Sequence, residues 1–359
     1  MVSSSTPRPK KRPKVVVFDV DETLGNFAQF SIFCHVLEEY FNKPDITYRH
    51  FNDLVDLYPE IIRPSMLRIL EYIRKKKNAG VCSKVMIYTN NMGPDKWVGH
   101  IRQYFEYKLR AMVAPPATSD DLAIVSPLFG HTIGGFKSQS AAVATASSSS
   151  SSSSSSDAFP QRSTKEKTVR DFIRCSRMPP DIEICFLDDV YHPKMTDERV
   201  YYIKLQAYHF HIPFHMFVIR FLNSRLYRDV FDGSKVSSIT PALSAVAKKQ
   251  VLSIELNDLF VRYANMAEYD VKSQQRKMNP REIDEIISKY ILYHLQQFFR
   301  DGPPPPRSLP SAHHHQRANN NTKKNRYSGT TATATAANVF YVDKASAVKN
   351  MRNKTVRNK

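Results

Sequence analysis

The chain has little cysteine and no long apolar run, and both shortages narrow its class. Four cysteines stand far apart among 359 residues, with no CxxC pair and no histidine at metal-ligand spacing. This pattern excludes a disulfide framework and favours reduced, buried cysteines in an intracellular protein, nuclear or cytoplasmic. No segment approaches the roughly 18 apolar residues of a membrane span, and the basic N-terminus contains no cleavable apolar region. We therefore expect no membrane contact.

Acidic residues are scarce at both ends of the chain. The formal net charge is +18, of which +5 comes from residues 1–14 and +9 from residues 301–359. The basicity therefore belongs to the tails, which could make weak electrostatic contacts with nucleic acid or acidic proteins. The run Pro7–Lys14 is compatible with a nuclear import signal and equally with a solvated basic arm.

Low-complexity segments indicate where the chain is not folded. Ten consecutive serines lie within a segment at about 136–162 that has too few apolar side chains to offset the entropy of ordering. We expect this segment to be a disordered insertion. Runs of proline, histidine and asparagine predict a disordered, basic tail over 301–359.

The remaining sequence indicates one principal domain. We expect a disordered basic arm over 1–14, an α/β domain over 15–230 and a helical extension over 231–300. Within the extension, segments 250–268 and 280–299 have helical periodicity.

The second helical segment of the extension has a recognisable start and a broad apolar stripe. Asn279 is the predicted N-cap and Pro280 the predicted first helical residue. The stripe requires a partner surface, and packing back on the domain is favoured over dimerisation. The oligomeric state stays open.

The strongest chemical signal follows a short apolar run near the N-terminus. Val15–Phe18 shows no polar alternation, which is typical of a strand buried on both faces of a parallel sheet. Asp19, Asp21 and Thr23 follow at once, at the strand end where open α/β sheets bind ligands. Two carboxylates two residues apart share one side of an extended chain and can address one metal ion and one phosphate.

This Asp-Val-Asp-Glu-Thr-Leu string resembles the first motif of the haloacid-dehalogenase (HAD) superfamily, and its DxDxTL form resembles the FCP/SCP (NLI-interacting-factor-like) phosphatases. The resemblance implies a Ser or Thr at the end of a second buried strand, and Thr89 directly follows the expected strand Lys84–Tyr88. It also implies an acidic pair ending a later strand, and Asp188 and Asp189 end Glu183–Leu187. Three strand-end motifs in the required order are a much stronger signal than one.

The resemblance further implies a lysine ahead of the strand that carries the acidic pair. Lys167 opens an amphipathic segment of helical spacing, and Lys165 competes for this assignment. Arg63-Pro64 before an apolar helix is a further likeness to the FCP/SCP enzymes. The implied fold is a three-layer, Rossmann-like HAD fold with a central parallel sheet and a small or absent cap, here followed by the helical extension.

The resemblance assigns a role to each motif residue. Asp19 would be the nucleophile that forms an aspartyl-phosphate, and Asp21 the general acid and base. Thr89 and Lys167 would bind the phosphoryl oxygens.

A Mg²⁺ ion would offset the repulsion between these carboxylates and a phosphate. Its ligands would be Asp19, the backbone carbonyl of Asp21 and the acidic pair. By resemblance Asp189 would bind the metal directly while Asp188 holds the lysine, although the sequence alone does not order the two. Thr23 is expected to tighten the loop, and His192 is treated as a loop residue.

The favoured function is therefore a Mg²⁺-dependent phosphomonoester hydrolase acting on phosphoserine or phosphothreonine in a phosphoprotein. This substrate class rests on analogy with the FCP/SCP enzymes. The alternatives are a phosphatase for small molecules or nucleic-acid ends, and a non-catalytic HAD scaffold that binds acidic partners. Where the FCP/SCP pattern has Thr-Ala-Ser, this chain has Thr89-Asn90-Asn91, which puts substrate recognition in doubt but not the chemistry.

Overall fold

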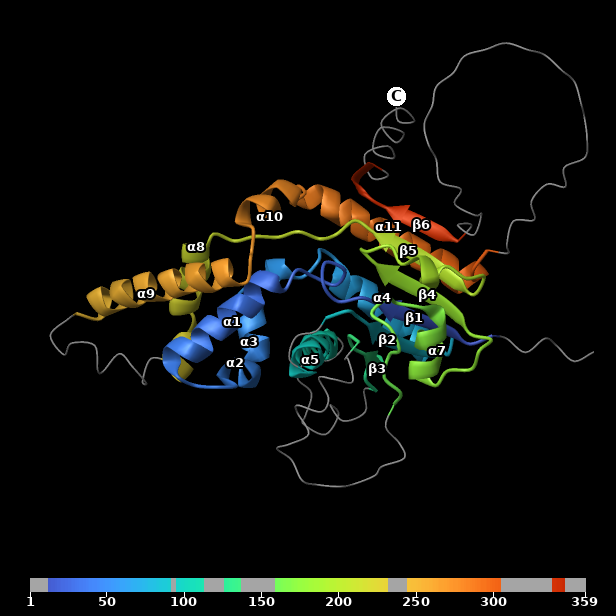
Figure 1. Cartoon of the computed structure of the whole chain (residues 1–359), viewed down its shortest axis with the longest axis horizontal. Helices are drawn as coiled ribbons and strands as arrows, with labels where there is room; N and C mark the ends of the chain where they lie inside the picture. Colours follow the sequence, from blue (N-terminus) through green and yellow to red (C-terminus); the bar gives the residue numbers. More distant parts are fainter. Residues whose placement is uncertain are drawn as a thin grey trace, which may run out of the picture.

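A six-stranded, all-parallel sheet forms the centre of the molecule (Figure 1). The computed structural model describes residues 12–91, 95–112, 126–136, 159–231, 244–304 and 338–345. The strands lie in the order β3-β2-β1-β4-β5-β6. Their bounds are β1 Lys14–Phe18, β2 Lys84–Tyr88, β3 Phe129–Ile133, β4 Glu183–Asp188, β5 Val200–Leu205 and β6 Val339–Val342. The predicted α/β class with a central parallel sheet is confirmed, and the arrangement is compatible with a Rossmann-like fold.

Helices cover both faces of the sheet, which gives three layers. Side chains of successive strand residues point to opposite faces, so Val15 and Val17 join one apolar cluster while Val16 and Phe18 join another. The first face is covered by α7 (Val169–Ser176). The second is covered by α4, α5 and α11, whose bounds are Met66–Asn78, Asp95–Ala111 and Arg281–Asp301. Strands β1, β2, β4 and β5 are buried along most of their length, as expected for strands covered on both faces, whereas the edge strands β3 and β6 are partly exposed.

Five further helices form a cluster beside the sheet (Figure 1). These are α1 Ala28–Phe41, α2 Ile46–Arg49, α3 Phe51–Asp56, α8 Phe214–Leu222 and α9 Ala245–Met266. Phe33 of α1 joins them, because its ring centroid lies 4.8 Å from that of Phe217 and 5.2 Å from that of Phe260. The connecting turns and short helices are η1 Pro59–Ile61, η4 Pro193–Met195, η5 Tyr227–Phe231 and α10 Val271–Lys277.

The helical extension packs back on the domain. Helix α9 contacts α1 and α8, and α11 contacts α4, β5 and β6. The predicted start of α11 is wrong by one residue: Pro280 is the N-cap, and its carbonyl accepts hydrogen bonds from the backbone of Ile283 and Asp284. Asn279 instead donates its side-chain amide to Asp284 Oδ1 (2.9 Å).

Strand β6 contradicts part of the expectation for residues 301–359. It pairs with β5 in parallel, so β5 is an interior strand of the sheet. Val342 is 1% exposed, and its carbonyl accepts a hydrogen bond from Gln206 N (2.8 Å). The physical reason is composition, because Val-Phe-Tyr-Val consists of β-branched and aromatic residues that suit a half-buried strand. The rest of the expected tail, 305–337 and 346–359, lies outside the described residues.

Two further predicted boundaries shift. Lys14 was assigned to the basic arm but begins β1, where its buried Nζ donates to the carbonyls of Phe298 (2.6 Å) and Phe299 (3.1 Å) near the end of α11. A cation near the C-terminal end of a helix interacts favourably with the partial negative charge of the last carbonyls. Arg162 was assigned to the insertion but is buried and donates to the carbonyl of Thr89 (3.2 Å).

The remainder of the predicted arm and insertion, residues 1–11 and 137–158, lies outside the described residues, as does 232–243 of the helical extension. Among the helices that the structure describes, none combines the length and apolar composition needed to cross a membrane.

We predict that Val342→Asp lowers the free energy of unfolding by about 2 kcal/mol, because it places a charge in a buried site without a partner. Tyr341→Asp is the matched control, since Tyr341 is 58% exposed on the same strand. Urea unfolding of both variants provides the measurement. Equal midpoints for the two variants would show that β6 does not belong to the cooperative fold.

Candidate active site

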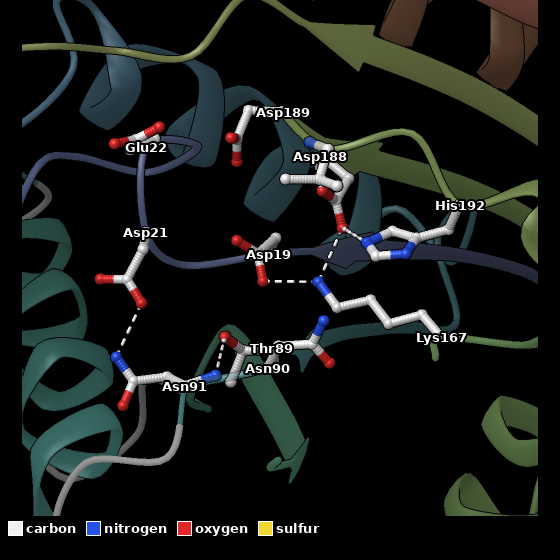
Figure 2. A pocket seen from close by; sticks show the side chains of 11 residues that line it. Asp19, Asp21, Glu22, Thr89, Asn90, Asn91, Lys167, Asp188, Asp189 and His192 are labelled. Carbon is white, nitrogen blue, oxygen red and sulfur yellow. Dashed lines mark hydrogen bonds and ion pairs between the residues drawn. The ribbon is translucent and has the colours of Figure 1, made fainter. Parts of the chain in front are cut away.

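Side chains from separate loops meet at the carboxyl end of the sheet, around a cavity of about 320 Å³ (Figure 2). The lining residues are Asp19, Asp21, Glu22, Thr89, Asn90, Asn91, Lys167, Asp188, Asp189, Val190 and His192. Asp188 is the last residue of β4, and the other residues follow β1, β2 or β4 or precede α7. The structure thus brings together every residue that the motifs predicted, except the alternative Lys165, which is exposed. In the described part of the chain, no residue of the helical cluster beside the sheet lines this cavity.

Lys167 lies at the centre of the cluster of charges. Its Nζ donates to Asp19 Oδ1 (2.6 Å) and to Asp188 Oδ2 (2.7 Å), and the lysine is 1% exposed. Helix α7 sets its position, since the N-cap Thr168 accepts a hydrogen bond from Asp171 N (2.9 Å) and fixes the turn that follows the lysine. Burial lowers the pKa of Lys167, but the two carboxylates outweigh it and raise that pKa overall. The lysine is therefore a permanent cation.

The two adjacent aspartates differ in what they bind. Both oxygens of Asp188 are occupied, one by Lys167 and the other by the backbone N of Val190 (2.7 Å). Asp189 instead exchanges hydrogen bonds with Thr23, whose Oγ1 donates to Oδ1 (3.0 Å) and accepts from the Asp189 N (3.1 Å). Asp189 Oδ2 accepts no hydrogen bond from a described residue, so Asp189 has more free acceptor capacity than Asp188.

Thr23 has the role expected of it. It is fully buried and connects the loop after β1 to the loop after β4. It does not line the cavity.

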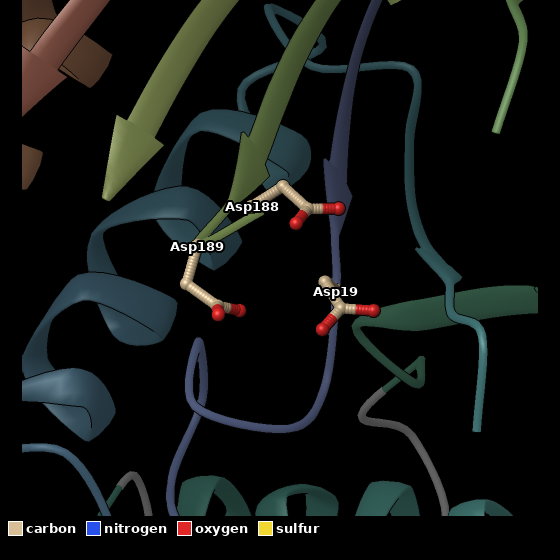
Figure 3. Close-up of side chains that lie close together, drawn as sticks. All are labelled: Asp19, Asp188 and Asp189. Atoms are coloured by element: carbon tan, nitrogen blue, oxygen red, sulfur yellow. The ribbon is translucent and has the colours of Figure 1, made fainter. Parts of the chain in front are cut away.

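Oxygens of Asp19, Asp188 and Asp189 lie within 4.8 Å of one another and can hold a metal ion (Figure 3). Burial, together with the charges of Asp19 and Asp188, raises the pKa of Asp189 to about 7. Burial likewise raises the pKa of Asp19 to about 6, against the opposing effect of Lys167. One lysine does not neutralise three buried carboxylates, so the donor set fits a hard divalent cation with oxygen ligands.

Asp21 points into the same cavity from the other side (Figure 2). Asn91 Nδ2 donates to Asp21 Oδ2 (2.7 Å), while burial raises the pKa of Asp21 despite this hydrogen bond and the charge of Lys167. A carboxyl group with a raised pKa keeps its proton longer, which suits a proton donor.

The loop after β2 is held by its own polar groups and by Arg162. Thr89 is 1% exposed and lines the cavity, and its Oγ1 accepts a hydrogen bond from Asn91 N (3.1 Å). Arg162 donates to the Thr89 carbonyl and to Asn90 Oδ1 (2.6 Å), with its guanidinium 4.9 Å from the ring centroid of Tyr88. Arg162, five residues before Lys167, therefore holds the loop that carries Thr89 in place.

Arg63 fastens the loop after β1. This arginine is 1% exposed, and it donates from Nε to the Thr23 carbonyl (2.7 Å) and from Nη2 to the carbonyls of Glu22 and Gln206. Glu22 has a left-handed backbone with φ of 56°. Non-glycine residues adopt this conformation only where the surroundings hold them. The predicted Arg-Pro feature thus positions the loop, although α4 itself begins at Met66.

Sequence reasoning missed three contributors. His192, treated as a loop residue, lines the cavity with Nε2 3.4 Å from Asp188 Oδ2. Asn91 and Arg162 had no assigned role, because neither residue type has a spacing that separates it from ordinary loop composition. The departure from Thr-Ala-Ser at Asn90-Asn91 was the available signal, since it placed two amides beside the predicted threonine.

The chain matches no protein-family model, no curated protein and no solved structure. Its chemistry is therefore inferred from the site itself.

We predict that Lys167→Met destabilises the metal-free protein by about 3 to 5 kcal/mol near pH 8, because it leaves buried carboxylates unpaired. The loss should shrink as the pH falls toward 5. Without the lysine the lowered pKa of Asp188 rises and the already raised pKa of Asp19 rises further, so the folded variant takes up protons and gains stability on acidification.

Urea unfolding in EDTA at both pH values measures this, with Lys165→Met at the exposed neighbouring lysine as control. A pH-independent loss would contradict the proposed charge balance.

Proposed function

We propose that the protein is a Mg²⁺-dependent phosphomonoester hydrolase of the HAD type. The observation that carries the proposal is the arrangement in one cavity of two aspartates, Asp19 and Asp21, with Lys167, Thr89 and the acidic pair after β4. A nucleophile, a proton donor, a fixed cation and a metal-binding carboxylate set are the groups that phosphomonoester cleavage requires.

In this proposal Asp19 attacks phosphorus in line, forming a P–O bond while the bond to the leaving oxygen breaks. The lysine near it and the metal reduce the repulsion between a carboxylate and a phosphate dianion. Lys167 donates to only one oxygen of Asp19, Oδ1. The other oxygen of that carboxylate remains for the metal or the substrate.

Asp21 gives its proton to the departing oxygen and then takes one from the water that hydrolyses the aspartyl-phosphate. Its raised pKa favours the first role, and the loss of that proton to the product leaves a carboxylate for the second. Asn91 holds the carboxyl group toward the cavity by its hydrogen bond to Oδ2.

Mg²⁺ would be held by Asp19, Asp189 and the backbone carbonyl of Asp21, where it would supply Lewis-acid stabilisation of the phosphoryl oxygens. Asp188 would act through Lys167, because both of its oxygens are already occupied. Thr89 would bind a phosphoryl oxygen through its hydroxyl.

A phosphoserine or phosphothreonine protein is the favoured substrate class. The cavity is small, about 320 Å³, and in the described part of the chain only loops at the strand ends line it. Such a site accepts a phosphorylated side chain from a larger molecule. A small phosphomonoester would fit the same cavity and is the second candidate. With no membrane-crossing helix among those described, an intracellular location stays part of the proposal.

We predict Mg²⁺-dependent release of phosphate from an aryl phosphate, abolished in Asp19→Asn because the amide cannot attack phosphorus. Asp21→Asn should slow the reaction by about 10²- to 10⁴-fold while leaving metal binding largely intact. Steady-state phosphate release with and without Mg²⁺ measures both effects.

Asp197→Asn is the matched control, since Asp197 pairs with Arg199 and lies outside the cavity. Normal turnover by Asp19→Asn would remove the nucleophile assignment, and a normal rate for Asp21→Asn would make that residue structural. If the wild-type protein releases no phosphate from any ester tested, the result would favour the alternative that the protein is a non-catalytic scaffold.

A further inference from the structure

A second and larger groove lies behind the loop that carries Asp19 and Asp21. Its volume is about 1190 Å³, and its walls come from η1, the start of α4, the end of α5, residues 208–210 and the start of α11. Part of this groove is built by the C-terminal helical extension, for which the catalytic motifs supply no role.

The groove and the catalytic cavity share a wall. Glu22 lines the cavity, while its carbonyl accepts hydrogen bonds from Arg63 Nη2 and from Tyr208 N (2.9 Å), and its carboxylate lies 3.5 Å from His209 Nδ1. Arg63, Tyr208 and His209 all line the groove. A ligand that occupies both spaces therefore passes over a single loop.

Most acidic side chains that line the groove are already paired. Asp56 accepts from Lys108 (2.9 Å), and Glu285 accepts from Arg281 (3.2 Å). Glu60 accepts from Arg220 through both of its oxygens, at 2.8 and 2.9 Å. The fourth acid, Asp284, is 4% exposed.

The basic groups of the groove are less fully paired. Arg68 and Lys289 are exposed and form no ion pair with any described residue. Arg63 Nη1 is buried without a hydrogen-bond partner. Burial lowers the pKa of Arg63 to about 10, opposed by the charge of Asp284, so the guanidinium stays protonated at neutral pH.

Helix α4 adds a further positive contribution. Its N-cap Ser65 makes no side-chain capping bond, and Ser65, Met66, Leu67 and Arg68 all line the groove. The unsatisfied N–H groups of a helix start carry partial positive charge. The lining of the groove therefore combines positive groups with apolar and aromatic side chains such as Met66, Tyr208 and Phe210.

We propose that this groove binds an acidic polypeptide segment that flanks the phosphorylated residue of the substrate. The proposal rests on the proposed phosphatase function and specifies its substrate. An extended chain advances about 3.3 Å per residue, so a few residues are enough to leave the catalytic cavity and enter a neighbouring groove. Arg68 and Lys289 attract acidic side chains, and the apolar walls contact the remainder of the segment.

The size of the groove favours a polypeptide over a free anion. A groove of about 1190 Å³ is several times larger than the catalytic cavity and far exceeds the needs of one phosphate. Its basic residues come from two helices, α4 and α11, so a single small ion would engage only some of them.

The test uses the full chain with the charge-reversed double variant Arg68→Glu/Lys289→Glu. Lys75→Glu is the matched control, because Lys75 is exposed on the same face of α4, two turns beyond Arg68, and does not line the groove. The binding probe is a fluorescently labelled, unphosphorylated peptide of alternating Glu and Gly, followed by anisotropy at low and at physiological salt. The kinetic probes are one phosphoserine peptide with acidic flanks, the same peptide with neutral flanks, and an aryl phosphate.

We expect the double variant to bind the acidic peptide about tenfold or more weakly at low salt, and to lose the preference in kcat/KM for acidic flanks. Turnover of the aryl phosphate should stay unchanged, as should all properties of Lys75→Glu. Equal peptide binding by wild type and double variant would overturn the groove proposal. Failure of the wild-type protein to bind the acidic peptide would also overturn it. Absence of aryl phosphate turnover in wild type would instead contradict the proposed function, and the binding experiment would still decide whether the groove takes acidic peptides.

Discussion

The contact of Lys167 with Asp19 and Asp188 is the interaction on which the site depends. Its two hydrogen bonds, 2.6 and 2.7 Å long, place a buried cation between carboxylates from two different strands. Burying like charges together is costly unless a counter-charge is held nearby. The lysine meets this need for Asp188 and one oxygen of Asp19, while Asp189 keeps a pKa raised to about 7. The remaining negative charge is the reason why this cluster could hold a metal ion.

Contacts elsewhere in the fold hold these charged residues in position. Strands β1 and β4 pair directly, with Phe18 opposite Leu187, and Asp19 N donates to the Leu187 carbonyl (2.9 Å). Thr23 ties the two following loops together, and Arg63 holds the first loop from behind. Because these contacts are buried, a substitution at Arg63 would disturb the loop after β1 even though Arg63 does not line the cavity.

The cluster of charged residues at the candidate site could be predicted from the sequence, because residues at the ends of neighbouring parallel strands lie at the same edge of the sheet. Val15–Phe18 ends at Asp19 in sequence and in space, and parallel pairing then brings Thr89 and Asp188 to the same edge. Residues that do not lie at a strand end could not be placed in this way. Arg162 and His192 reach the site through loop geometry. Strand β6 escaped prediction because Val339–Val342 is short and surrounded by biased composition, and only its pairing with β5 shows that it belongs to the sheet. The sequence also did not show which of the two adjacent aspartates holds Lys167, and the hydrogen bonds show that it is Asp188.

The central claim is that Asp19 becomes phosphorylated during turnover. The most direct measurement is intact-protein and peptide mass spectrometry of Asp21→Asn, quenched during reaction with an aryl phosphate in Mg²⁺ and reduced with borohydride to label the acyl phosphate. Without its general base the variant should hydrolyse the intermediate slowly. The account predicts that the label is found on the peptide containing Asp19. Phosphate release without any labelled Asp19, or a label on another residue, would contradict it.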